Sequence, residues 1–128
     1  MGSAKAEIDI EASPEKVWEL VGNFGGIADW MPGLDACTVK GDDRTISMLG
    51  MEIVERLYDR DEEARSITYG IVGGSLSLDH HRATIKVQPS GTGSFVTWEV
   101  DVKPDNLTEV MEQTYQGSLD ALKERFEK

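Results

Sequence analysis

The sequence contains few of the residues that build covalent cross-links, metal centres or sites for polyanions. Cys37 is the only cysteine in 128 residues, so the chain forms no internal disulfide. We predict no metal and no cofactor, because the only 2 histidines, His80 and His81, are neighbours that would point to opposite faces of a strand. The 13 lysines and arginines are outnumbered by 24 aspartates and glutamates, and the net charge of −11 repels nucleic acid and anionic membrane surfaces.

The sequence also lacks apolar runs of membrane-spanning length, a secretion signal and a lipidation motif. We therefore expect a cytoplasmic protein that neither inserts into a membrane nor binds nucleic acid. Walker loops, dinucleotide fingerprints and Gly-x-Ser-x-Gly elbows are absent, which argues against the common nucleotide-binding and serine-hydrolase classes. The length and the 39% hydrophobic content fit one globular domain over residues 1–128, as a monomer or as a homodimer paired through a strand edge.

The longest regular pattern lies between Pro104 and Lys128. Apolar or small residues recur there at every third or fourth position, which predicts one long amphipathic helix. Asn106 and Glu109 have the spacing of a capping box at its start. Gly117 lies near the middle of the predicted helix face, where it favours either room for a ligand or close approach of a strand. The helix needs an apolar partner surface about 30 Å long.

The remainder of the chain predicts that partner surface. Ser13 and Pro14 begin a short helix, and residues 27–30 form another helical turn. Short turns make consecutive strands antiparallel neighbours, so the predicted fold class is α+β, with a seven-stranded antiparallel sheet covered by the C-terminal helix. The alternation of apolar and polar residues, broken by turn clusters, predicts strands at residues 5–11, 35–40, 44–49, 51–58, 65–72, 78–87 and 94–103.

Side-chain alternation also assigns an inner face to the sheet. Tyr69 and Trp98 point towards the helix with their apolar neighbours, and the same register places Asp79, His81 and Glu55 inside. An interior of aromatic and methionine side chains with a few polar groups is typical of a small-molecule pocket, and also of a solid core. The candidate ligand-binding residues are Trp30, Met48, Ile53, Trp98, Met111, Tyr115 and Leu119.

Glu55, His81 and Tyr69 are the candidate catalytic residues. A carboxylate and an imidazole in an apolar space would suit proton transfer in a cyclisation, dehydration or isomerisation. The alternative is structural: Glu55 pairs with Arg56 or Arg82 after a register slip, and His81 is a hydrogen-bonded core residue. One strand bulge would reverse the two faces.

Several motifs carry a resemblance to a known family. They are Ile8-x-Ile10-x-Ala12-x-Pro14-x-x-Val17-Trp18, then Trp30-Met31-Pro32, Val54-Glu55-Arg56-Leu57, Ile67-Thr68-Tyr69-Gly70-Ile71-Val72, Val96-Thr97-Trp98-Glu99 and Leu119-Asp120-Ala121-Leu122-Lys123. In these motifs and in the order of its elements, the chain resembles the START-like superfamily, also called Bet v 1-like or SRPBCC, in its polyketide cyclase/dehydrase branch.

The resemblance implies a helix-grip fold, in which a curved sheet and the long helix enclose a cavity for a hydrophobic small molecule such as a lipid, polyketide or other aromatic. It assigns no residue a catalytic role. We therefore expect a ligand-binding protein, with a cyclase, dehydratase or isomerase as the alternative. A third possibility is a protein-binding module related to the toxin-like branch that associates with ribosomes, and the acidic charge argues against contact with ribosomal RNA.

Overall fold

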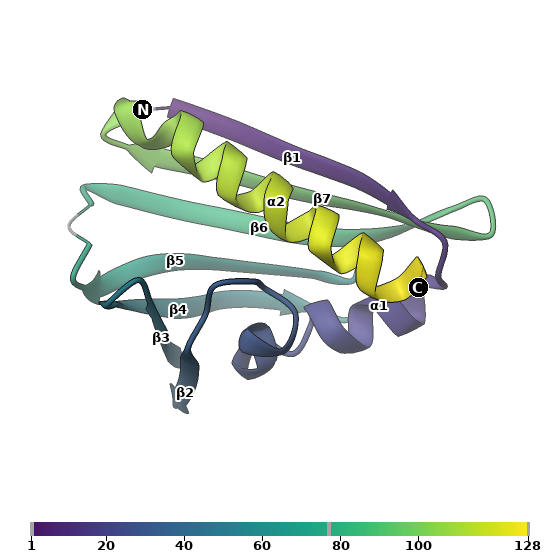
Figure 1. Ribbon diagram of the computed structural model, residues 1–128, viewed down its shortest axis with the longest axis horizontal. Helices are drawn as coiled ribbons and strands as arrows, with labels where there is room; N and C mark the ends of the chain where they lie inside the picture. Colours follow the sequence, from purple (N-terminus) through teal and green to yellow (C-terminus); the bar gives the residue numbers. More distant parts are fainter. Residues whose placement is uncertain (1, 77, 128) are drawn as a thin grey trace.

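The sheet and the long helix are both present in the computed structural model, which describes residues 2–76 and 78–127. Within these residues seven strands form one antiparallel sheet in the order β1-β7-β6-β5-β4-β3-β2 (Figure 1). The strands are β1 (Gly2–Ile10), β2 (Ala36–Lys40), β3 (Asp43–Met48), β4 (Met51–Asp61), β5 (Ser66–Gly74), β6 (His80–Ser90) and β7 (Gly93–Lys103). Each strand overlaps one that the sequence predicts.

Two short helices follow β1, as predicted. Helix α1 (Pro14–Val21) starts after Ser13, whose side chain accepts a hydrogen bond from the backbone N–H of Lys16 at 3.4 Å. Proline at the first position suits this helix start, because the missing N–H would have no partner within the helix. A 3-10 helix, η1 (Phe24–Asp29), comes next and brings Trp30 over the inner face of the sheet.

The long helix α2 (Thr108–Glu127) starts later than the sequence indicated. A 3-10 turn, η2 (Asp105–Leu107), precedes it, and Asn106 lies inside that turn. The predicted capping box at Asn106 and Glu109 is therefore wrong. The Thr108 hydroxyl instead donates a hydrogen bond to the carbonyl oxygen of Asp105 at 2.7 Å.

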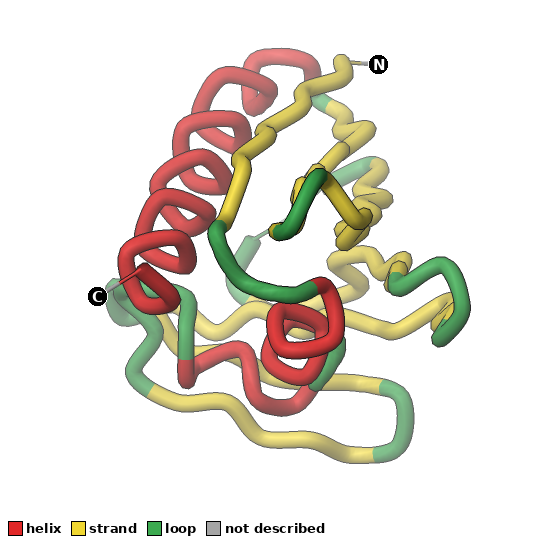
Figure 2. The backbone as a smooth tube through the Cα atoms, turned by 90° about the vertical axis from the view of Figure 1, so that its right-hand side faces the viewer, coloured by secondary structure: helices red, strands yellow, loops and turns green. Residues whose placement is uncertain are grey.

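Helix α2 runs along β1 and covers the inner face of a curved sheet (Figures 1 and 2). Two side chains of α2 donate hydrogen bonds to backbone carbonyl oxygens of β1. Gln116 Nε2 donates to Glu7 at 3.1 Å, and Lys123 Nζ donates to Asp9 at 2.7 Å. Arg125 Nη1 donates to the carbonyl oxygen of Asp29 at 2.9 Å, so the end of the helix also holds the chain next to Trp30. The buried residues of α2 are Met111, Tyr115, Ser118, Leu119 and Leu122.

Gly117 faces solvent, and the sequence interpretation that placed it beside a ligand or a strand is wrong. A Cβ atom built at Gly117 meets nothing within 4 Å. We expect Gly117→Ala to raise the free energy of unfolding by about 1 kcal/mol, since glycine is less favourable than alanine in a helix by roughly this amount. Urea denaturation measures the change. Gly93→Ala is the opposite control, because a Cβ there would collide with the carbonyl oxygen of Ile10; an unchanged or lowered stability of Gly117→Ala would contradict the expectation.

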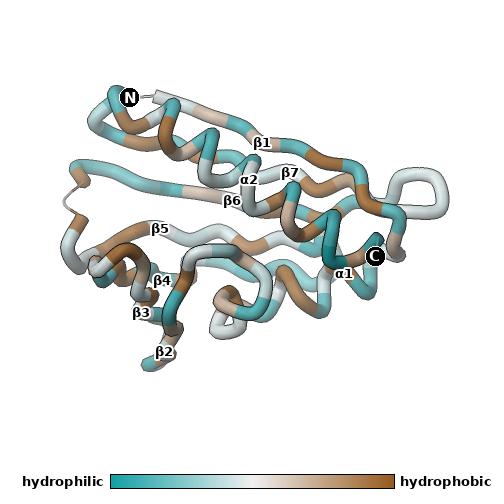
Figure 3. The backbone as a smooth tube through the Cα atoms, viewed as in Figure 1, coloured by the Kyte–Doolittle hydropathy of each residue, from teal (hydrophilic) through white to brown (hydrophobic). Residues whose placement is uncertain are grey.

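The inner face matches the predicted alternation along β5, β6 and β7, and Figure 3 shows hydrophobic and hydrophilic residues interspersed along the strands. Tyr69, Trp98 and Leu119 are almost completely buried. The pairing register between β4 and β5 shifts at two places. At the first, the extra residue is Val72 on β5, and the second lies after Leu57 on β4. Neither shift inserts a residue into β4 before Glu55, so Glu55 stays on the inner face. Asp79 is exposed and precedes β6, so its predicted inward position is wrong.

Candidate functional site

A buried ion pair lies at one end of the interior. Arg44 on β3 is directly opposite Glu55 on β4, and its side chain is 2% exposed. Its Nε donates to Glu55 Oε1 at 2.8 Å, and its Nη2 lies 2.6 Å from the same oxygen. Its Nη1 donates to the carbonyl oxygen of Phe24 at 2.7 Å. The guanidinium group also lies 3.8 Å from the centre of the Phe24 ring. These contacts compensate two charges that would otherwise be costly to bury.

Hydrogen bonds and one ring stack connect the aromatic residues beside this pair. Trp98 Nε1 donates to the Tyr69 hydroxyl at 3.0 Å, and the Tyr115 ring stacks on Trp98 at 4.1 Å between centres. The Tyr115 hydroxyl lies 3.1 Å from His81 Nε2. The backbone N–H of Ile71 donates to His81 Nδ1 at 3.1 Å, so the neutral ring carries its proton on Nε2 and donates it to Tyr115.

Burial keeps these groups in their neutral forms. It lowers the pKa of His81 to about 4, so the imidazole is uncharged at neutral pH. Burial also raises the pKa of both Tyr69 and Tyr115, so the two phenols keep their protons. The arrangement is therefore a fixed set of neutral donors and acceptors beside one compensated ion pair.

A family model described as polyketide cyclase/dehydrase and lipid transport matches residues 1–127. The chain belongs to this family. Among solved structures, XoxI from Bacillus cereus superposes with a TM-score of 0.93 at 26% identity, covering 98% of this chain and 96% of the other. A protein from Thermobifida fusca superposes with a TM-score of 0.86 at 28% identity, covering 98% and 93% of the two chains. The resemblance to the START-like superfamily and its helix-grip fold is confirmed.

Two further proteins are similar to this member of the polyketide cyclase/dehydrase and lipid transport family, one in sequence and one in fold. The abscisic acid receptor PYL7 of Arabidopsis thaliana is 28% identical over 112 residues, which covers 76% of this chain. The chain spans about half, 53%, of the length of that receptor. Ara h 8.0201 superposes with a TM-score of 0.75 at 16% identity, covering 97% and 96% of the two chains, and this likeness shows the fold alone.

In this family member the candidate catalytic residues lie in one neighbourhood, with the Arg44 guanidinium group 4.9 Å from the centre of the Tyr69 ring, but among the described residues no hydrogen bond joins Glu55 to Tyr69 or His81. His81 lies near Tyr69, with 6.0 Å between ring centres, and bonds Tyr115. Glu55 bonds Arg44 instead. The predicted alternative partners were Arg56 and Arg82, and among the described residues neither of them bonds Glu55; Arg56 bonds Asp43. The structural role predicted for His81 as a hydrogen-bonded core residue matches its contacts.

The candidate ligand-binding residues do face a common interior. Six are buried, and Met48, at the end of β3, is half-buried. The sequence interpretation missed Arg44, although its alternation with Ile46 and Met48 along residues 44–48 would have placed it inside. The six are Trp30, Ile53, Trp98, Met111, Tyr115 and Leu119.

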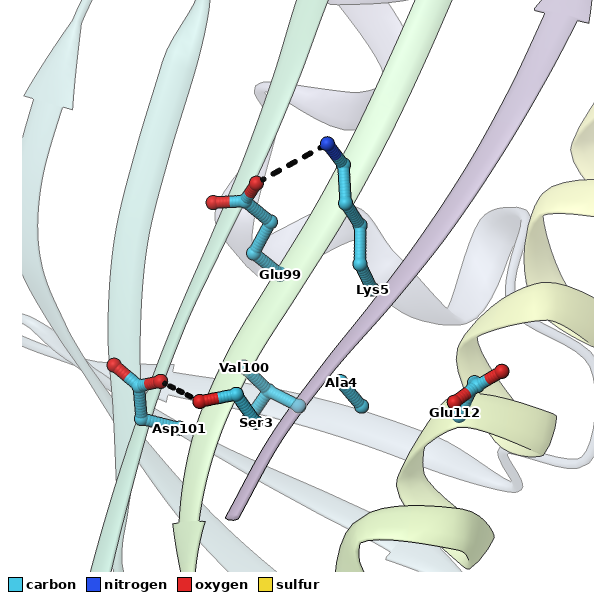
Figure 4. Close-up of a pocket in the computed structure, with 7 residues that line it drawn as sticks. All are labelled: Ser3, Ala4, Lys5, Glu99, Val100, Asp101 and Glu112. Carbon is cyan, nitrogen blue, oxygen red and sulfur yellow. Dashed lines mark hydrogen bonds and ion pairs between the residues drawn. The ribbon is translucent and has the colours of Figure 1, made fainter. Parts of the chain in front are cut away.

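Several hollows formed by the described residues open at the surface around this interior. One of about 550 Å³ opens beside β1 and β7, where Lys5 pairs with Glu99 and Ser3 bonds Asp101 (Figure 4). Another, of about 220 Å³, lies at the end of β5 and is lined by apolar residues that include Ile71, Leu76 and Leu78. The second adjoins the aromatic interior, because the backbone of Ile71 bonds His81. A third, of about 510 Å³, also adjoins it, because its lining includes Phe24, which contacts Arg44 and Tyr69.

Within residues 2–76 and 78–127, histidine, cysteine, aspartate and glutamate nowhere gather in a group of three able to hold a metal ion. In that part of the chain, no helix combines the length and apolar character needed to cross a membrane.

Proposed function

We propose that this protein binds a small hydrophobic molecule, of the lipid, polyketide or aromatic kind, between the inner face of the sheet and α2. The observation that carries the proposal is the set of polar groups held among aromatic rings in this interior. Burying polar groups costs free energy that an aliphatic core avoids, whereas ligand sites combine apolar walls with a few fixed polar groups. These groups are Arg44, Glu55, Tyr69, His81 and Tyr115.

The relatives support a binding role. The family description includes lipid transport, and PYL7 is named as a receptor for abscisic acid. The apolar wall of the site would be formed by Trp30, Met48, Ile53, Trp98, Met111, Tyr115 and Leu119.

We propose the hollow at the end of β5 as an access route to this site. Its lining residues Ile71, Leu76 and Leu78 are half-buried and apolar, and Ile71 is bonded to the imidazole of His81. The side chains of the interior are closely packed, with Trp98 and Leu119 almost inaccessible. A ligand that enters here therefore displaces side chains, and methionines such as Met48 and Met111 adjust more easily than branched residues.

The alternative, in which Glu55, His81 and Tyr69 transfer protons to cyclise, dehydrate or isomerise such a ligand, stays a prediction. Glu55 Oε1 already accepts a hydrogen bond from Arg44 Nε and forms an ion pair with Arg44 Nη2, and both ring nitrogens of His81 are engaged. A general base must reach the proton that it removes. These contacts favour binding over catalysis.

Native mass spectrometry of the protein purified from its own cells tests the proposal. We expect an added mass from a bound apolar molecule that is lost on unfolding. Met111→Trp should remove it by filling the interior from α2, whereas Val110→Trp places the same indole on the outer face of the helix and should retain it. Circular dichroism verifies that both variants are folded. An adduct retained by folded Met111→Trp, or no adduct on the unmodified protein, would contradict the proposal.

A further inference from the structure

The indole N–H of Trp30 is buried and has no hydrogen-bond partner among the described residues. The residue as a whole is only 7% exposed, so bulk water does not readily supply the missing acceptor. The other two tryptophans are satisfied: Trp18 Nε1 donates to Glu62 at 2.8 Å, and Trp98 Nε1 donates to Tyr69 at 3.0 Å. A buried indole N–H normally finds an acceptor, because leaving it unpaired forfeits the hydrogen bond that water would supply. The unpaired group at Trp30 therefore requires an explanation.

Trp30 belongs to the proposed ligand site. Its ring lies 5.7 Å from that of Trp98, which stacks on Tyr115. The backbone around it is held in place, because the N–H groups of Trp30 and Met31 both donate to the carbonyl oxygen of Ile27, at 3.2 and 2.9 Å. The neighbouring residue Asp29 is bonded to Arg125 of α2. The backbone that carries this indole is thus held in place, and the ring lies against the aromatic residues of the interior.

The charges of the interior restrict what such a donor would bind. Arg44 is the only buried lysine or arginine in the part of the chain that the structure describes, and its guanidinium group is engaged by Glu55 and the carbonyl oxygen of Phe24. Both nitrogens of His81 are also engaged. An anionic ligand would find no uncompensated positive charge inside, and its desolvation would oppose binding.

Resting on the proposed function, we infer that the ligand is an uncharged apolar molecule with a carbonyl oxygen, such as a ketone, a quinone or an ester, and that this oxygen accepts a hydrogen bond from Trp30 Nε1. The carbonyl supplies an acceptor without a charge, which satisfies the donor and leaves the Arg44–Glu55 pair undisturbed. The stacked rings of Trp98 and Tyr115 provide a flat apolar surface for the remainder of the molecule.

Three compounds with one planar skeleton test the inference: fluorenone, fluorene and fluorene-9-carboxylate. Calorimetry with the whole protein should show fluorenone binding more tightly than fluorene by roughly tenfold or more, the usual effect of satisfying a buried donor. The carboxylate should bind most weakly. In ¹⁵N-labelled protein, the indole resonance of Trp30 should move downfield with fluorenone and not with fluorene, while that of Trp18 stays in place.

Two variants assign the effect to Trp30. Trp30→Phe should bring the affinities for fluorenone and fluorene together, because the ring remains apolar and the donor is gone. Trp18→Phe, which also removes one indole, should preserve the difference. Should Trp30→Phe not fold, the indole resonance of the unmodified protein decides alone.

Equal affinities for fluorenone and fluorene, a preference that persists in Trp30→Phe, or tightest binding of the carboxylate would each overturn the inference while the proposed function stands. Failure of all three compounds to bind would also overturn it. The adduct seen by native mass spectrometry then decides separately on the proposed function.

Discussion

Replacing Arg44 with methionine is expected to lower the free energy of unfolding by about 3–5 kcal/mol, the usual cost of leaving one partner of a buried ion pair without the other. Glu55 would keep its place on β4, with no cation to compensate it, and the carbonyl oxygen of Phe24 would lose its donor. Methionine approximates the volume of the arginine stem, so the loss reports mainly on charge and hydrogen bonding. Urea denaturation at neutral pH measures it.

The exposed pair formed by Arg56 and Asp43 is a matched control. It joins the same two strands, with Arg56 Nε 2.8 Å from Asp43 Oδ1, but the arginine side chain is 52% exposed. Arg56→Met should therefore change the stability far less than Arg44→Met does. The double variant Arg44→Met with Glu55→Met should recover most of the loss, because it removes both buried charges. A small effect of Arg44→Met alone would show that water or a neighbour compensates Glu55.

The fold was predictable because its signals are local. A period of two residues identifies the strands and their inner faces, and the period of the apolar residues in α2 identifies the helix that covers them. Asp79 was misplaced because the alternation was extended beyond the true start of β6 at His80. The capping box failed for a related reason: residues 105–107 form a separate 3-10 turn, and spacing alone does not distinguish such a turn from the first turn of a helix.

The site was only partly predictable because its contacts are not local. Alternation placed Glu55, Tyr69 and His81 inside correctly, but the partner of Glu55 depends on the register between β3 and β4. The missing acceptor at Trp30 depends on how η1, α2 and the sheet meet in space. No spacing within one element encodes either feature.

The buried imidazole of His81 should make the stability depend on pH. Burial lowers its pKa from 6.5 to about 4 in the folded protein, whereas the unfolded chain keeps the ordinary value. Between these two values the unfolded state binds the extra proton, so the stability that His81 contributes is fully present above pH 6.5 and decreases as the pH falls towards 4. The expected loss is about 3 kcal/mol over this range.

Comparison with His81→Gln isolates this effect from the many carboxylates. Glutamine offers one acceptor for the N–H of Ile71 and one donor for the Tyr115 hydroxyl, and it does not titrate. Urea denaturation between pH 7 and pH 4 should therefore show a shallower decline for His81→Gln than for the unmodified protein. Protonation of His81 would place a second N–H, on Nδ1, against the N–H donor of Ile71, so we expect it to cost stability in the folded protein. Equal slopes for His81→Gln and the unmodified protein would contradict this expectation.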